Sequence, residues 1–358
     1  MDPHEKMYRE ITEAFGVPGY EDEVRSVILK YLKPHADEIT TDNLGSVIAK
    51  KEGKKNTVRI LFVAHMDECG FMVKSLTKEG YIRFLPLGGW HPPVALGQRV
   101  LIKTCKGPVM GVIGAQPPHG MTDEEKKKPI ELDDLWIDAG VSGEYNPAAS
   151  IPIRPGDPIA PFGPYAPTAN PRIALARNWD NRVGCAVLLR IFSELKKNKL
   201  PCTVYGAFAV QEEVGLRGAG TVAWKVDPDI AIALDVSQGF DTPGDKDESD
   251  ARLGRGASIL IYDRSMIPHI ALRDTLSELA DQHKIPYHFS TVMGGYDTGR
   301  VHLHKDGVPS CVLGIPSRYI HGFASMVHMD DIDSAARLGR TLAEHATDAL
   351  LRRLRTFQ

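Results

Sequence analysis

Hydrophobic and polar residues recur with a helical period in the first part of the chain. The segments 3–15, PHEKMYREITEAF, and 21–32, EDEVRSVILKYL, both show it, and Pro34 follows the second. Apolar residues three and four positions apart form one face of a helix, and proline tends to end it. The pattern predicts two helices, then a turn and a short strand in DNLGSVIAKK.

From residue 58 onward, short apolar runs alternate with amphipathic stretches. A run buried on both faces of a sheet is apolar almost throughout, whereas a helix shows its polar face every turn. This alternation predicts an α/β fold with a mixed sheet, at least partly parallel, flanked by helices. The predicted strands are 58–64, 203–210, 229–236, 257–263 and 310–316, and the predicted helices are 184–199, 267–283 and 333–354.

Residues 73–165 do not follow this rhythm. They contain short β-like pieces broken by turns, such as YIRFLPLGGWHPP and IPIRPGDPIAPFGP. We therefore expect a small β-barrel-like domain at 73–165, inserted into a catalytic domain formed by 1–72 and 166–358. The alternative is that these pieces are additional strands of one large domain.

Composition removes several classes of function. A formal charge of −3 without a basic stripe argues against a nucleic-acid partner. No apolar stretch reaches the ~18 residues of a membrane helix, and the charged N-terminus lacks the apolar core of a signal peptide. The five cysteines show no CxxC spacing, so neither a disulfide framework nor a thiolate zinc site is expected. These features predict a cytoplasmic protein.

Residues that can bind metal follow several of the predicted strands. The carboxyl ends of parallel strands meet at one edge of a sheet, where ligands gather. Taken singly, each residue has a structural explanation, such as a helix cap, a turn or a hydrogen-bonded histidine. The candidates are His65 and Asp67 after ILFVA, Asp180 in NWDNRVG, Glu212 and Glu213 after GAFAVQ, Asp235 in AIALDV, and His321 after CVLGIPSRYI.

Together these residues form an imidazole and carboxylate set that suits Zn²⁺, Co²⁺ or Mn²⁺. The adjacent Glu212 and Glu213 would repel each other unless they had separate roles. Neighbours at a strand end point in opposite directions, so one glutamate can bind a metal while the other acts as a general base. Asp67 is placed to accept the proton of the His65 nitrogen that does not bind metal.

Several motifs, in order, resemble the dinuclear metallopeptidase family 42, which includes glutamyl aminopeptidases and tetrahedral, self-compartmentalising aminopeptidases. The resemblance covers nearly the whole chain. Its motifs are TEAFGVPGYEDEVR, DNLGSVIA, VAHMDECGFMV, PIELDDLWIDAG, DNRVG, QEEVGLRGA, ALDVS, DTPG, MGGYDTG and GIPSRYIH.

The resemblance implies an aminopeptidase that acts on peptides with a free N-terminus. It implies two divalent ions, Zn²⁺ or Co²⁺ with Mn²⁺ as an alternative, and an inserted domain that assembles the chain into a homo-oligomer, usually a dodecamer. It implies that His65, Asp180 and Asp235 bind one ion, and that Asp180, Glu213 and His321 bind the other, so that Asp180 bridges the two. Glu212 would then be the general base, and Asp67 would orient His65.

Three features depart from the family pattern or extend it. Trp179 stands where the family has a smaller residue, so its ring either narrows the substrate pocket or packs in the core. GFASMVH follows His321 where a serine and a proline are expected. Tyr296 and Asp297, in MGGYDTG, are candidate substrate contacts.

Other functions stay open at this stage. A related di-metal hydrolase, such as an N-acyl amino acid deacylase, would use the same glutamate pair on another substrate. A glucanase is disfavoured because histidine ligands differ from the two-carboxylate arrangement of glycoside hydrolysis. A non-catalytic, metal-stabilised assembly protein is a third class. The preferred N-terminal side chain of the substrate is not determined by these motifs.

Overall fold

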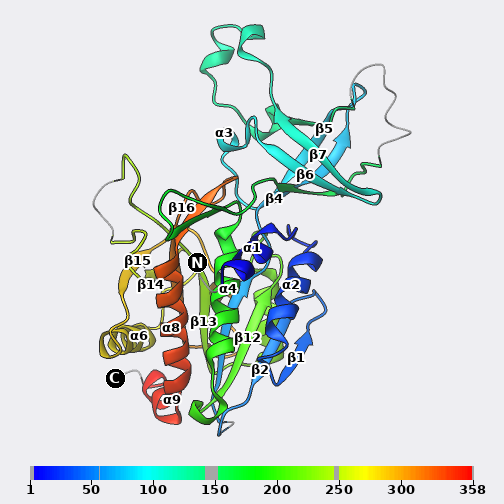
Figure 1. Cartoon of the computed structure of the whole chain (residues 1–358). Coiled ribbons are helices and arrows are strands. Elements are labelled where there is room, and N and C mark those ends of the chain that lie inside the picture. The colour runs from blue at the N-terminus through cyan, green and yellow to red at the C-terminus, as the bar shows by residue number, and fades with distance from the viewer. Residues whose placement is uncertain (1–3, 56, 142–151, 246–249, 357–358) are drawn as a thin grey trace.

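The computed structural model describes residues 4–55, 57–141, 152–245 and 250–356. It contains a large sheet covered by helices and a separate barrel above it (Figure 1). No helix in these ranges is long and apolar enough to cross a membrane.

Eleven strands among the described residues form one mixed sheet. Its centre is parallel, with β12 beside β3, β3 beside β13, and β13 beside β16, while the pairs outside it are antiparallel except for the parallel pair of β14 and β15. The expected mixed α/β sheet is therefore confirmed. In spatial order the strands are β1 (Glu38–Thr41), β2 (Val47–Lys51), β12 (Thr203–Ala209), β3 (Arg59–His65), β13 (Ile230–Gln238), β16 (Ser310–Arg318), β17 (Ser325–His328), β11 (Ile173–Ala176) and β10 (Ala166–Pro167), with β14 (Ala257–Tyr262) and β15 (Tyr287–Thr291) branching from β16.

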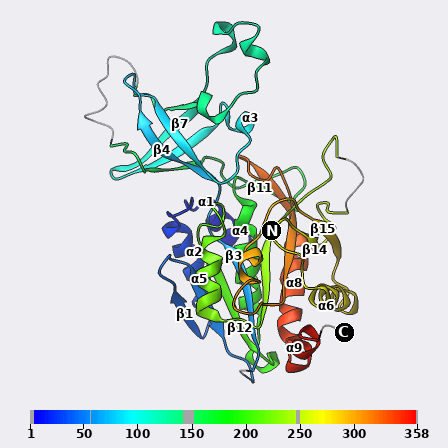
Figure 2. The ribbon, with the colours of Figure 1, turned by 180° about the vertical axis from the view of Figure 1, so that it is seen from behind.

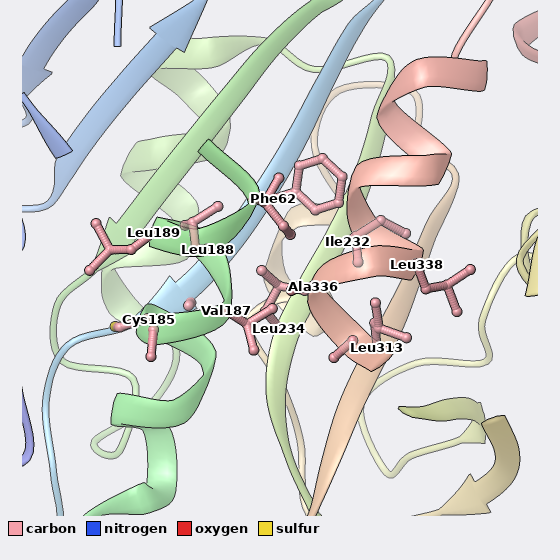
Figure 3. Packing of buried hydrophobic residues seen from close by; sticks show 14 of the residues in the cluster. Phe62, Cys185, Val187, Leu188, Leu189, Ile232, Leu234, Leu313, Ala336 and Leu338 are labelled. Carbon is pink, nitrogen blue, oxygen red and sulfur yellow. The ribbon is translucent and has the colours of Figure 1, made fainter. Parts of the chain in front are cut away.

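Helices cover both faces of the sheet (Figures 1 and 2). One face carries α1 (Glu5–Glu13), α2 (Asp22–Leu32), α4 (Trp179–Glu194) and α8 (Met329–His345), whose apolar residues share one core with the strands. Figure 3 shows side chains of α4 and α8 meeting Phe62 of β3 and Ile232 of β13. The other face carries α5 (Arg217–Val226) and α7 (Thr298–Val301), and α6 (Ile270–Gln282) and α9 (Asp348–Leu354) lie beside β14 and α8.

Three predicted helices have different bounds in the structure. The helix expected at 184–199 begins earlier, at Trp179, and ends at Glu194, before the 3₁₀ turn η4 (Lys197–Lys199). The helix expected at 267–283 begins at Ile270. The helix expected at 333–354 is two helices, because Thr347 caps α9 by accepting a hydrogen bond from the Leu350 N–H.

Six strands in the described part of 70–161 close into a barrel that pairs only within itself, so the barrel begins a few residues before the expected start at 73. Phe71, Ile113 and Ile137 are fully buried in its own core. The expected barrel-like insert is confirmed, and residues 142–151 lie outside the described part. The strands are β4 (Gly70–Leu76), β5 (Ile82–Leu87), β8 (Trp136–Asp138), β7 (Gly107–Gly114), β6 (Arg99–Thr104) and β9 (Pro158–Pro161), with the short helices α3 (Pro92–Ala95), η1 (Pro118–Gly120), η2 (Glu125–Lys127) and η3 (Leu132–Asp134).

The barrel stands over the carboxyl ends of the central parallel strands. Strand β3 ends at His65, and β4 of the barrel begins at Gly70; both strands are labelled in Figure 2. The intervening four residues cross directly from the sheet to the barrel. The edge where metal-binding residues were predicted to gather is therefore the junction between the two bodies.

Candidate metal centre

His65 and Asp235 come from neighbouring buried strands. His65 ends β3, Asp235 lies in the parallel strand β13, and their side chains are 2% and 4% exposed. Nε2 of His65 lies 3.7 Å from Oδ2 of Asp235. We call these two residues the inner half of the centre. The parallel strand pairing brings the two side chains to the same edge of the sheet.

Asp180 lies between two histidines. It sits in the first turn of α4, where its backbone is not helical, and the bond to Asn181 is cis. Its Oδ1 is 3.4 Å from Nε2 of His65, and its Oδ2 is 3.2 Å from Nε2 of His321. One carboxylate thus presents one oxygen to each imidazole, which is the arrangement that a bridging ligand needs.

Glu213 and His321 form what we call the outer half. Oε2 of Glu213 is 3.5 Å from Nε2 of His321. His321 follows β16 on a loop, with a positive φ of 56°, and its Nδ1 lies 3.0 Å from the carbonyl oxygen of Gly89. Its side chain is 39% exposed, far more than that of His65. A segment of the barrel therefore fixes the ring, and Nε2 is left to face the carboxylates.

Asp67 holds the glutamate pair through the backbone. Its two carboxylate oxygens accept the N–H groups of Glu212 and Glu213, each at 3.0 Å. Nδ1 of His65 lies 3.0 Å from the carbonyl oxygen of Asp67 and 3.5 Å from its carboxylate. Asp67 thus contacts the imidazole of His65 and the backbone of both glutamates.

A turn precedes the two glutamates. The sequence argument relied on strand alternation, but β12 ends at Ala209, three residues before Glu212. Gln211 has a positive φ of 57°, and its N–H donates to the Glu21 carboxylate at 3.2 Å. This turn places Oε2 of Glu212 3.7 Å from Nε2 of His65, while Glu213 faces the outer half.

The centre concentrates buried negative charge. Burial and the neighbouring Asp180 raise the pKa of Glu213 to about 7, and burial raises the pKa of both Glu212 and Asp235 well above the usual carboxyl range. Although burial opposes it, hydrogen bonding to Asp180 raises the pKa of His321 to about 10. Divalent cations would neutralise this charge and relieve the repulsion.

The expected departures from the family pattern are explained by packing. Trp179 is fully buried, donates from Nε1 to the Ala174 carbonyl, and lies edge-on to Tyr8 and Tyr165. Its ring therefore packs in the core and does not narrow the cleft. In the loop after His321, Phe323 is buried against Trp90 of the barrel segment.

The two candidate substrate contacts differ in position. A cleft of about 530 Å³ opens over the centre and includes Tyr296, whose hydroxyl donates to the Val236 carbonyl. Asp297 is 1% exposed and does not line this cleft. Tyr296 remains a candidate contact, whereas Asp297 lies behind it.

Sequence reasoning missed two neighbours of the centre. Glu68 is buried and accepts hydrogen bonds from Arg177 and Arg182, which tie it to α4 and its preceding loop. Cys69 lies beside Glu213 and His321, within 4.8 Å between candidate ligand atoms. Its position two residues after Asp67 was the available signal, but no second cysteine stands at CxxC spacing to mark it as a ligand.

Comparisons with known proteins agree with this geometry. A family model described as M42 glutamyl aminopeptidase matches residues 45–338, and a second model, AMPT, matches residues 2–28. A glutamyl aminopeptidase of Lactococcus lactis subsp. cremoris is 35% identical over 339 residues, covering 93% of each chain.

Solved structures show the same likeness over the whole chain. The TET aminopeptidase of Thaumarchaeota archaeon SCGC AB-539-E09 has a TM-score of 0.94 at 39% identity and covers 99% of this chain and 100% of its own. PhTET1-12s, described as a dodecamer, has a TM-score of 0.84 at 30% identity, covering 97% and 100%. The chain therefore belongs to the M42 family of aminopeptidases.

Proposed function

We propose that this protein is a dinuclear metallo-aminopeptidase that removes N-terminal residues from peptides with a free amine. The observation that carries the proposal is the position of Asp180. Its two oxygens lie 3.4 Å from Nε2 of His65 and 3.2 Å from Nε2 of His321. A carboxylate shared between two ions is the core of paired metal centres in aminopeptidases.

The residues present fit two divalent ions. Oε1 of Glu213 has no hydrogen-bond partner among the described residues, although its side chain is only 4% exposed. Leaving a buried carboxylate oxygen unpaired is costly, and a cation would satisfy it. Imidazole and carboxylate donors suit Zn²⁺, Co²⁺ or Mn²⁺. We assign His65, Asp180 and Asp235 to one ion, and Asp180, Glu213 and His321 to the other.

Glu212 is the proposed general base. When bound, the ions would polarise the scissile carbonyl and lower the pKa of a coordinated water. Glu212 would take a proton from the attacking water and pass it to the leaving nitrogen. Asp67 positions it by accepting its backbone N–H.

The inserted domain, residues 73–165, is proposed to drive assembly of the chain. The expected assembly is a homo-oligomer, by analogy with the relative PhTET1-12s, which is described as a dodecamer. We also propose a cytoplasmic location, because the five cysteines at 69, 105, 185, 202 and 311 are all unpaired. Light scattering of the purified protein tests the oligomeric state.

The function is tested with aminoacyl p-nitroanilides, free and N-acetylated. The protein is stripped with a chelator and refilled with Zn²⁺, Co²⁺ or Mn²⁺. Metal-dependent cleavage of free-amine substrates alone supports the proposal. Preferential cleavage of the acetylated set would instead indicate a deacylase, and inactivity on both sets with metal bound would favour an assembly protein.

A further inference from the structure

Cys69 lies beside the outer half of the centre. It is buried, at 7% exposure, in the link between β3 and β4. Its Sγ, a carboxylate oxygen of Glu213 and a ring nitrogen of His321 all lie within 4.8 Å of one another. Ligand atoms lie about 2.0–2.3 Å from a zinc ion, so atoms this close need only a small adjustment to share one.

A second observation points to a ligand at the same place. The Glu213 side chain is 4% exposed, and its Oε1 has no hydrogen-bond partner in the described chain. The Cys69 thiol donates to the Gly89 carbonyl at 3.8 Å and also hydrogen-bonds the Glu213 carboxylate. A cation bound here would satisfy the unpartnered oxygen of Glu213, and the sulfur lies close enough to join it.

The barrel segment keeps the thiol in place. Gly88 has a positive φ of 91°, and a Cβ added there would lie 2.4 Å from Sγ of Cys69 and 3.0 Å from Oε2 of Glu213. Only a glycine allows the backbone to close so tightly over this pair. The next residue, Gly89, accepts from Nδ1 of His321, so one short segment fixes both Cys69 and His321.

The other cysteines differ in their surroundings. Cys185 is buried, but its Sγ donates to the His65 carbonyl at 3.1 Å, and Cys105 is exposed on the barrel. Among the described residues, Cys69 is the cysteine that belongs to a group of potential metal ligands.

We propose that Cys69 is a sulfur ligand of the ion held by Glu213 and His321. The inference rests on the metal centre proposed above. As sulfur binds, the thiol proton leaves to solvent and a sulfur–metal bond forms. The outer half would then favour softer ions, such as Zn²⁺, Co²⁺ and Cd²⁺, over Mn²⁺, which prefers oxygen ligands.

The test compares full-length wild-type protein with Cys69→Ser, Cys69→Ala and the matched control Cys105→Ser. Each is stripped of metal and refilled with Co²⁺. We expect a sulfur-to-cobalt charge-transfer band in the near ultraviolet for wild type and Cys105→Ser, and its loss in both Cys69 variants. The Cd²⁺ affinity of the outer half should fall about tenfold or more in Cys69→Ser, with the Mn²⁺ affinity within about threefold of wild type.

A second measurement needs no variant, in case the Cys69 variants fail to fold. X-ray absorption at the zinc edge of the wild-type protein distinguishes a sulfur neighbour at about 2.3 Å from nitrogen and oxygen at about 2.0–2.2 Å. Two ions bound without a sulfur neighbour or a charge-transfer band would overturn the role of Cys69 and leave the proposed function intact. Failure of wild type to bind two ions would contradict the proposed function itself.

The wall of the cleft carries a second, independent inference. Beyond the candidate ligands and Glu212, the described residues that line it are four glycines and six uncharged side chains. A charged substrate side chain held against this wall would find no oppositely charged partner in it, so its desolvation would not be compensated. The six are Leu216, Val236, Gln238, Val292, Tyr296 and Ile320.

We also infer that this cleft selects an uncharged, mainly aliphatic N-terminal residue. The relative from Lactococcus lactis, by contrast, is named for glutamyl substrates. The kcat/KM for leucyl and methionyl p-nitroanilides should exceed that for glutamyl and lysyl substrates about tenfold or more, ~1.4 kcal/mol. Gln238→Lys should shift the ratio toward the glutamyl substrate, whereas Gln238→Asn should leave it near wild type.

Glutamyl or lysyl as the best substrate of the wild-type protein would overturn this preference while keeping the aminopeptidase. Inactivity on all free-amine substrates would instead count against the proposed function.

Discussion

The inner and outer halves of the candidate centre differ in the elements that carry their side chains and in how exposed those side chains are. His65 and Asp235 of the inner half stand on adjacent parallel strands and are 2% and 4% exposed. His321 of the outer half stands on a loop, is 39% exposed, and depends on Gly89 of the barrel segment for its orientation. Strands under a packed core hold side chains more rigidly than loops do. We therefore expect the inner ion to be bound more tightly than the outer ion.

The largest effect is expected where the halves meet. Asp180→Ala removes the carboxylate that faces both histidines, so both ions should bind weakly and activity should fall further than in any other variant. Metal content by mass spectrometry, together with initial rates, measures this. Asp133→Ala, on the exposed η3 turn of the barrel, is the matched control. Two tightly held ions per chain in Asp180→Ala would contradict the bridge.

The adjacent glutamates offer the next comparison. Glu212→Gln should lower kcat roughly 10²–10⁴-fold, the usual contribution of general acid–base catalysis, while two ions stay bound. Glu213→Gln should instead lose the outer ion. Rates and metal content of both variants are measured in parallel. Near-normal activity in Glu212→Gln, or ion loss in that variant, would reverse the assignment.

The histidines separate the halves directly. Losing a group that only supports a ligand costs about 10–100-fold in metal affinity, so losing the ligand itself should cost more. His321→Ala should release the outer ion and keep the inner one, whereas His65→Ala should impair the inner ion. In wild type, a chelator should remove the two ions in separate phases, the outer first. Simultaneous release would remove the distinction between the halves.

A smaller effect is expected from pH. The pKa of His321 is raised to about 10 in the metal-free protein by its contacts with Asp180 and Glu213, so its ring is protonated at neutral pH. Since a protonated ring cannot bind metal, ion binding must release a proton and the outer affinity should rise with pH, by up to about tenfold per unit for each proton. Titration calorimetry at pH 6 and pH 8, in buffers of different ionisation enthalpy, counts the protons released.

The same raised pKa of His321 also determines how the free energy of unfolding of the metal-free protein changes with pH. A raised histidine pKa stabilises the metal-free fold fully below the unfolded pKa of about 6.5. That contribution is lost as pH rises through about 10. His321→Gln should remove this part of the pH dependence of unfolding, and an unchanged profile would contradict it.

The smallest effect is expected from Trp179, the buried residue that precedes Asp180. Trp179→Phe removes the Nε1 hydrogen bond to the Ala174 carbonyl and should cost about 0.5–1.5 kcal/mol in the free energy of unfolding. Both ions and the substrate preference should stay as in wild type. Denaturant unfolding measures the first, and the p-nitroanilide panel checks the second. A changed substrate preference would place the ring in the cleft after all.

Much of the centre could be predicted because polar residues interrupt strongly apolar strands. His65 and Asp235 stand at or near the ends of apolar runs that are typical of strands buried on both faces of a sheet. The structure brings these two residues together with Asp180 and His321. Strand alternation, however, gave the wrong reason for the split between Glu212 and Glu213. The turn at Gln211 depends on Glu21, which is distant in sequence, so local periodicity could not reveal it.

Periodicity and the order of motifs were enough to predict the α/β architecture, the barrel-like insert and the residues of the candidate metal centre, since these features are local or sequential. Only the tertiary structure decided which residues face one another. It placed Trp179 in the core, brought Cys69 to the outer half, and set Gly89 of the barrel against His321. These contacts join segments far apart in the chain, and their geometry arises only when the barrel closes over the edge of the sheet.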